Sequence, residues 1–235
     1  MSLVELISQA DERGLAAGGL ACLDRCLPLL GGDDETLRPL WGSLAEGADP
    51  GTWGTILEQV RDKLSGGEGA GEDAAAQLAR RMLTAAPAEP SGDGLRAWAD
   101  ACSVASLRIH RLLDPGADSD GTVGDAEPVD AHREGRTDGM SPLVAAELRR
   151  QITVLELLAE HGAAGLRPAL EVSTEGRRIL RAVVSRRARG AGLSGAGRSV
   201  ERACSNPGGG GESCDRSWGG RGAVSRRLRK AARSA

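Results

Sequence analysis

Apolar side chains recur at steps of three and four residues along the first half of the chain, which is the spacing of one face of an α-helix. The first clear stripe predicts a helix over about 15–30, and a shorter helix over about 2–13 precedes it, with Gly14 at the break. The stripe of the longer helix consists of Leu15, Gly19, Cys22, Leu23, Cys26, Leu27 and Leu30.

Four more helices follow from the same spacing and from residues that favour helix ends. Asp33 or Asp34, and then Asp49, can accept from the free amides of a first turn, and Pro50 suits the first helical position. Further helices are expected over 73–86 and about 93–113. The expected buried faces are Leu37, Leu40, Trp41 and Leu44; Trp53, Ile56, Leu57, Val60 and Leu64; Leu78, Met82 and Leu83; and Leu95, Trp98, Cys102, Ala105, Ile109 and Leu112.

Residues 114–140 interrupt this pattern. Residues 114–139 hold eight carboxylates, two arginines and almost no large apolar side chain, too few to offset the entropy lost on ordering. We predict a disordered acidic linker over 114–140, which either joins two helical pieces or is an insertion.

Helical spacing returns with Ser141 as a cap and Pro142 in the first turn, and His161 and Gly162 end it. A last helix is expected over about 174–189, so that 141–189 forms one or two helical segments. Beyond Gly190 the spacing is lost, and the Gly, Arg and Ser content of 190–235 predicts a disordered tail. A shifted reading frame in part of this tail stays open as an alternative.

The composition also favours helices over sheets. The 235 residues include 29 Leu against 12 Val and 5 Ile, with no Phe and no Tyr, so Leu and Ala must fill the core. The expected fold class is all-α, a helical bundle or irregular helical array, with a helical domain over 1–113. Whether 141–189 packs on that domain stays open.

The net charge of −3 conceals an uneven distribution along the chain. Residues 1–176 carry 15 basic and 30 acidic side chains, whereas 177–235 carry 15 basic and 3 acidic ones. Such asymmetry is typical of an interaction tail, but an acidic body could also hold that tail against itself. Both interpretations stay open.

The N-terminal residues lack the basic start and apolar run of a secretory signal, and the longest largely apolar run, 15–23, is too short to cross a bilayer. Five cysteines are too few for a disulfide scaffold in a chain of this size. We expect a cytoplasmic protein that does not enter a membrane.

The cysteines suggest packing more than metal binding. Cys22 and Cys26 share a helix face, as two metal ligands would, but they lie on the leucine stripe with no histidine or second cysteine pair near them in sequence. We predict buried free thiols there and at Cys102. Cys204 and Cys214 have no local histidine, so no metal is expected.

Two glycine-containing stretches match ligand motifs only in part. Residues 190–195, GAGLSG, have the spelling of a dinucleotide-binding loop, but an arginine-rich stretch stands where the strand should precede it. Residues 116–127 align partly with a calcium loop, but Gly116 takes the place of the first carboxylate and Pro128 follows the loop. No cofactor is therefore predicted.

The histidines lack a recognisable catalytic context. His110 lies between Arg108 and Arg111, off the apolar stripe, and is expected to be exposed. His132 falls in the acidic linker and His161 at a helix end. No known nucleophile motif is present, so no catalytic residue is assigned, although groups can still converge from distant positions.

These observations favour a non-catalytic protein-interaction or regulatory module with a protein partner. Nucleic-acid binding through the arginine-rich C-terminal segment is the alternative, and an enzyme whose site is not readable from sequence is the second. The expected contacts to an anionic partner are Arg177, Arg178, Arg181, Arg186, Arg187, Arg189, Arg226, Arg227, Arg229 and Lys230.

Overall fold

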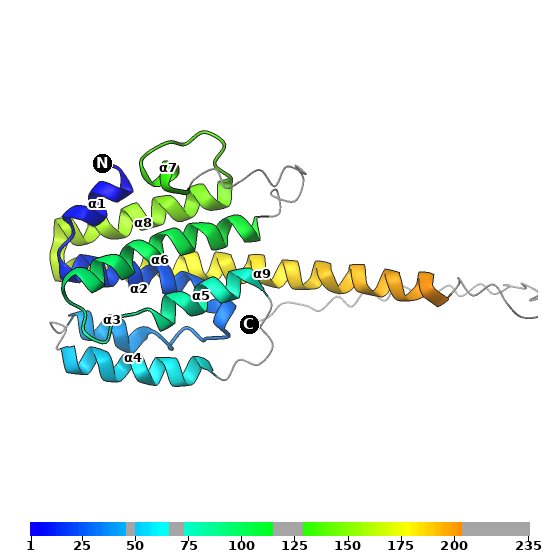
Figure 1. The fold of residues 1–235 in the computed structure, drawn as a ribbon, viewed down its shortest axis with the longest axis horizontal. Coiled ribbons are helices and arrows are strands. Elements are labelled where there is room, and N and C mark those ends of the chain that lie inside the picture. The colour runs from blue at the N-terminus through cyan, green and yellow to red at the C-terminus, as the bar shows by residue number, and fades with distance from the viewer. Residues whose placement is uncertain (46–49, 66–72, 115–128, 204–235) are drawn as a thin grey trace, which may run out of the picture. The chain divides into compact units, whose positions relative to one another are not determined.

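The computed structural model describes residues 1–45, 50–65, 73–114 and 129–203, with backbone alone for Pro50 and for 190–203. Throughout these residues the regular structure is helical, which confirms the all-α fold class (Figure 1). In the same part of the chain, no helix combines the length and apolarity needed to cross a bilayer.

The N-terminal pair of helices divides earlier than the sequence spacing predicts. Helix α1 (Leu3–Gln9) opens with a capping box in which Ser2 and Glu5 satisfy each other's backbone amides. Helix α2 (Glu12–Cys26) begins before Gly14, because the Asp11 carboxylate accepts a 2.7 Å hydrogen bond from the Gly14 amide. After Cys26 the chain tightens into a 3-10 turn, η1 (Leu27–Leu30), so the expected helix over 15–30 is two elements.

Helix α2 is the central helix of the fold. From Gly14 to Cys26 every residue except Gly18 is buried, and α2 packs against α3, α6 and α8 (Figure 1). Small residues let these neighbours approach: a β-carbon at Gly19 would lie 2.6 Å from the Trp98 ring. The sequence stripe therefore describes one face of a helix that is in fact buried on all sides.

Helices α3 (Arg38–Ala45), α4 (Pro50–Ser65) and α5 (Ala74–Thr84) form one side of the fold (Figure 1). Their predicted inner faces are buried at Leu40, Leu57 and Met82. Arg61 on α4 donates to the carbonyls of Leu83, Thr84 and Ala86, three acceptors at the C-terminal end of α5. The predicted cap Asp49 lies outside the described residues.

Helix α6 (Gly92–Leu113) follows α5 after a short turn and packs on both α5 and α2. Its Trp98 donates 2.9 Å to the Met82 carbonyl and meets Trp53 edge to face, with ring centroids 6.4 Å apart. At its end Leu112, predicted to be inward, is 44% exposed, and Leu113 is the buried residue.

Residues 129–140 are more ordered than predicted. Part of the expected acidic linker forms α7 (Val129–Arg133), with Val129, Ala131, His132 and Arg133 buried against the fold. The prediction of disorder is thus wrong for 129–140; residues 115–128 lie outside the described part. A few apolar residues are enough to order this segment because Arg133 also makes polar contacts with α6.

Helix α8 (Pro142–His161) begins at the predicted cap, where Ser141 accepts from the Val144 amide. A 3-10 turn, η2 (Gly162–Gly165), leads into α9 (Leu166–Ala203). The last helix therefore starts at Leu166, not near 174, and its backbone passes Gly190 without ending there. Residues 204–235, the rest of the predicted tail, lie outside the described part.

Candidate functional site

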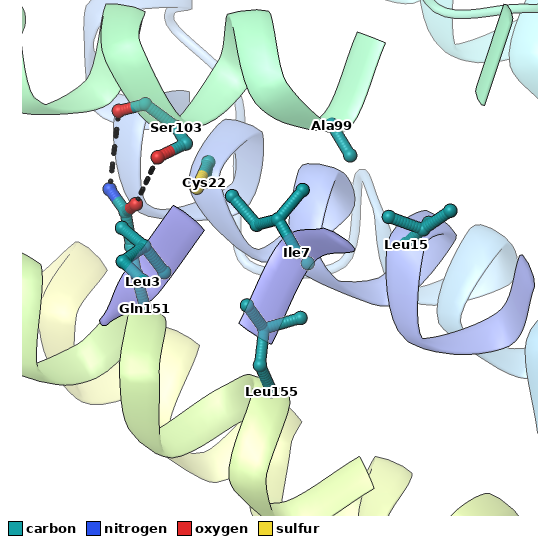
Figure 2. A pocket seen from close by; sticks show the side chains of 9 residues that line it. Leu3, Ile7, Leu15, Cys22, Ala99, Ser103, Gln151 and Leu155 are labelled. Atoms are coloured by element: carbon teal, nitrogen blue, oxygen red, sulfur yellow. Dashed lines mark hydrogen bonds between the residues drawn. The ribbon is translucent and has the colours of Figure 1, made fainter. Parts of the chain in front are cut away.

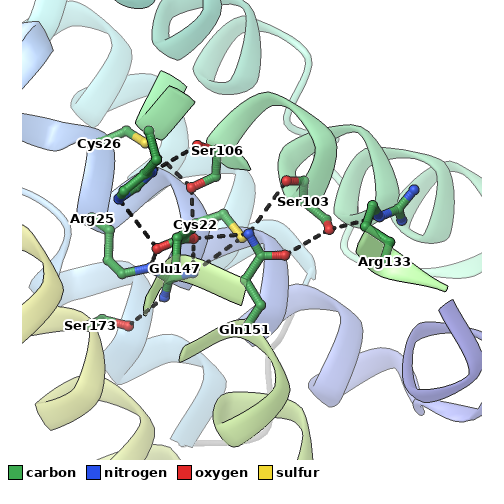
Figure 3. A network of polar contacts seen from close by, with 10 residues as sticks. Cys22, Arg25, Cys26, Ser103, Ser106, Arg133, Glu147, Gln151 and Ser173 are labelled. Carbon is green, nitrogen blue, oxygen red and sulfur yellow. Dashed lines mark hydrogen bonds and ion pairs between the residues drawn. The ribbon is translucent and has the colours of Figure 1, made fainter. Parts of the chain in front are cut away.

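A buried ion pair joins the C-terminal end of α2 to the N-terminal part of α8. The Nε and Nη2 atoms of Arg25 donate to the two carboxylate oxygens of Glu147 at 2.8 and 2.7 Å (Figure 3). Both side chains are completely buried. Such bidentate geometry is the strongest that an arginine and a carboxylate form.

Side chains of two further helices, together with a second residue of α8, complete this pair. Ser106 on α6 donates 2.7 Å to Glu147 Oε1, and Gln151 on α8 donates 2.9 Å to the same oxygen. Ser173 on α9 accepts from Arg25 Nη1 at 3.5 Å (Figure 3). We call Arg25, Glu147, Ser106, Gln151 and Ser173 the central polar network, because it ties α2, α6, α8 and α9 together.

The network continues to α7 through one serine. Ser103 donates 2.7 Å to Gln151 Oε1 and accepts 3.2 Å from Arg133 Nε (Figure 3). Arg133 also pairs with Asp100 on α6 and, at 3.3 Å, with Asp130 on its own helix. These contacts explain why α7 folds onto α6 despite its acidic surroundings.

His110 is buried inside the fold, so the prediction that it is exposed is wrong. It is 2% exposed; Nδ1 lies 2.7 Å from the Ser106 carbonyl oxygen and Nε2 lies 3.5 Å from Glu147 Oε2. The prediction failed because Arg108 and Arg111 are exposed, whereas His110 faces Glu147 on α8. Burial lowers the pKa of His110, although Glu147 opposes this effect.

Electrostatics keep Glu147 ionised at this depth. Burial alone would raise the pKa of Glu147, but Arg25, His110 and the hydrogen bonds from Arg25 and Gln151 hold it at about 2. Burial likewise opposes the charge on Arg25, and the adjacent Glu147 outweighs it and raises the pKa of Arg25. The two charges are therefore retained as a pair.

The arrangement of Ser106, His110 and Glu147 differs from a catalytic triad. The serine hydroxyl bonds directly to the carboxylate, whereas a triad requires it to bond to the histidine. All three side chains are within 2% of complete burial. A substrate has no path to this hydroxyl, so the contacts support a structural role.

The cavity beside this network is very small. It lies between α1, α2, α6 and α8, where Leu3, Cys22, Ser103, Gln151 and Leu155 are among its lining residues (Figure 2). Its volume of about 10 Å³ is the room of roughly one water molecule. No substrate of ordinary size fits there.

The three described cysteines are free and buried, as predicted. Burial raises the pKa of the Cys22 thiol to about 12 and raises the pKa values of Cys26 and Cys102 as well. Within the described residues, no three His, Cys, Asp or Glu side chains gather as a metal site would require. Cys204 and Cys214 lie outside those residues.

The glycine-containing motifs receive little support from the backbone. Residues 190–195 are helical as part of α9, so they do not form the turn that a dinucleotide loop needs. The calcium-like stretch 116–127 lies outside the described residues. His132 is buried in α7, and His161 stands at the end of α8 as expected.

A second group of ion pairs joins α9 to α2. Arg177 pairs with the buried Asp24 and lies 3.3 Å from Asp34, to which Arg181 donates at 2.8 Å. Burial raises the pKa of Asp24, while Arg177 opposes that rise. Gly176 lets α9 come close, since a β-carbon there would lie 2.4 Å from Arg25 Cδ.

This packing occupies some of the arginines that were expected to contact an anionic partner. Arg177 is 3% exposed and is therefore withdrawn from the surface. Arg181 holds Asp34, and Arg187 donates to the Leu112 carbonyl. The exposed members are Arg178, Arg181, Arg186, Arg187 and Arg189. The remaining candidates, Arg226, Arg227, Arg229 and Lys230, lie outside the described residues.

An open groove lies between α5 and α6, away from the polar network. Its volume is about 330 Å³, and most of its lining is apolar. Met82, Trp98 and Cys102 are its most buried lining residues, whereas Arg81 on α5 and Arg108 on α6 are exposed. The remaining lining residues are Leu78, Ala85, Ala101, Val104 and Ala105.

Sequence reasoning found the buried faces of α5 and α6 but not this groove. A stripe specifies which residues face inward, whereas a groove depends on how closely two helices approach. The burial of Asp24 and Arg25 did carry a signal: Ala16, Ala17, Leu20 and Ala21 make the other faces of α2 apolar too. Charges within such a helix must find partners inside.

Comparisons of the chain with known protein families, with curated proteins and with solved structures find no match.

Proposed function

We propose that this protein is a non-catalytic interaction module that binds a partner protein in the groove between α5 and α6. The single observation that carries the proposal is the open, mainly apolar groove of about 330 Å³ between two helices. A groove of this kind is one of the forms in which proteins receive a helix of a partner.

The polar side chains support the same choice. The side chains of the central polar network and His110 bond to one another at complete or nearly complete burial. Their donors and acceptors already bond to groups on neighbouring helices. The groove is therefore the better candidate for contact with another molecule.

Site-specific cross-linking tests the proposal. A photoreactive residue at Ala101, in the groove, should capture one or a few discrete proteins in the native cell, whereas one at the exposed Thr153 on α8 should not. A captured protein supports the proposal only if, once purified, it binds the unmodified chain and not the groove-filled variant Ala101→Trp. Equal capture from both positions would contradict it.

Binding of an anionic partner, such as nucleic acid, is a second candidate. The exposed Arg178, Arg186 and Arg189 on α9 favour it, because guanidinium groups bind phosphates well. Deletion of 190–235, or the triple substitution Arg178→Gln/Arg186→Gln/Arg189→Gln, should then reduce retention on duplex DNA at low salt. Retention that neither change alters would refute this candidate.

A further inference from the structure

The walls of the groove extend far enough to receive a helix. Its lining residues run from Leu78 on α5 to Ala85, the residue just after that helix, and from Trp98 to Arg108 on α6. At 1.5 Å per residue these walls are about 10 and 15 Å long, which a partner helix covers in about three turns. The groove is open to solvent, so a compact ligand would leave much of its surface in water.

The charges on the walls are all of one sign. Arg81 stands on the α5 wall and Arg108 on the α6 wall, both exposed, and none of the described residues that line the groove is acidic. By contrast, residues 1–176 as a whole carry twice as many acidic as basic side chains. The groove is thus a basic-edged apolar site on an acidic body, and an acidic partner complements it.

We propose that the groove binds an amphipathic helix of a partner protein whose apolar face carries Leu- or Met-sized side chains and whose flanks carry Glu or Asp. The inference rests on the proposed function and specifies the chemistry of the partner. The apolar face would pack over Leu78, Val104 and Ala105, the partly exposed apolar lining residues, while the acidic flanks pair with Arg81 and Arg108.

Model peptides test this directly with the full chain. Three fluorescent peptides of about 14 residues share a Leu face at helical spacing and carry Glu, Gln or Lys on the remaining positions. Fluorescence anisotropy should rank their affinities Glu above Gln above Lys. Nonspecific attraction to the acidic body would give the reverse order.

Charge reversal separates groove binding from attraction to the basic C-terminal segment. The double substitution Arg81→Glu/Arg108→Glu should lower the affinity for the Glu peptide about tenfold and raise the affinity for the Lys peptide. Both arginines are exposed, so the variant should keep the wild-type circular dichroism spectrum. The matched control Arg149→Glu, at an exposed arginine on α8, should leave the Glu peptide unaffected.

The outcomes distinguish this inference from the proposed function. If Ala101→Trp blocks the Gln peptide while reversal of Arg81 and Arg108 changes nothing, the groove binds helices but the acidic preference is wrong. If Ala101→Trp changes the binding of no peptide, both the proposed function and this inference are wrong. Saturable binding of decanoate in the groove, with no peptide bound, would also overturn the inference, because the ligand would then be a small amphiphile.

Discussion

Removal of Glu147 alone should destabilise the fold far more than removal of Glu147 together with Arg25. Glu147→Leu leaves the Arg25 guanidinium completely buried without its carboxylate, and it also removes an acceptor from Ser106 and Gln151. In Arg25→Met/Glu147→Leu both charged side chains are replaced by apolar ones, so no unpaired charge remains in the interior.

The magnitudes follow from the burial of the pair. Breaking a buried ion pair by removing one partner costs about 3–5 kcal/mol, whereas replacing both partners by apolar groups is often close to neutral. Ser106 still loses its acceptor in the double variant, which costs about 1–3 kcal/mol. We therefore expect the double variant to be more stable than Glu147→Leu, although it carries one more substitution.

Urea unfolding followed by circular dichroism measures this double-mutant cycle. Gln151→Leu, which keeps the ion pair, serves as a milder variant if Glu147→Leu does not fold. A Glu147→Leu variant within about 1 kcal/mol of the wild type would refute the reasoning. So would a double variant whose loss equals the sum of the two single losses, because the pair would then contribute nothing as a unit.

Three further predictions concern pH, packing and thiol reactivity. His110 has a lowered pKa in the folded protein, so the unfolded chain takes up its proton first and stability should fall as the pH drops below about 6.5; Glu147, lowered from 4.5 to about 2, adds a further loss as the pH falls between those values. His110→Gln should flatten the upper part of the curve of unfolding free energy against pH, measured with urea. An unchanged slope would contradict the assignment of this pH dependence to His110. Gly19→Ala should cost about 1–3 kcal/mol in thermal or urea unfolding, since the new methyl group meets the Trp98 ring, while Gly42→Ala, where space is open, should not destabilise; equal stabilities would contradict this. In a Cys204→Ser/Cys214→Ser variant, the buried thiols of Cys22, Cys26 and Cys102 should react with a thiol reagent only as fast as the protein unfolds, and rapid labelling of the native state would disprove it.

The sequence was sufficient for the elements whose signals are local. Apolar spacing placed α4, α5, α6 and α8, and Ser141 caps α8 as its side-chain chemistry predicts. These features depend on residues within one or two turns of each other, so a single segment contains them. The free, buried state of the three described cysteines followed from the same spacing.

The partners of charged residues depended on contacts between distant segments. Arg25 meets a carboxylate 122 positions away, and Arg177 meets one 153 positions away. No local pattern carries that pairing, so Arg177 was expected at the surface and His110 in solvent. The fold of 129–133 was missed for the same reason, because Arg133 binds Ser103 and Asp100 on α6.

By itself, then, the sequence determined where α4, α5, α6 and α8 form and which faces of them are apolar, because helix spacing and end-capping act over a few residues. Only the tertiary structure decided that α2 lies at the centre, that its charges are paired inside, and that a groove stays open between α5 and α6. Burial and pairing are properties of several helices at once, and they exist only when those helices are packed together.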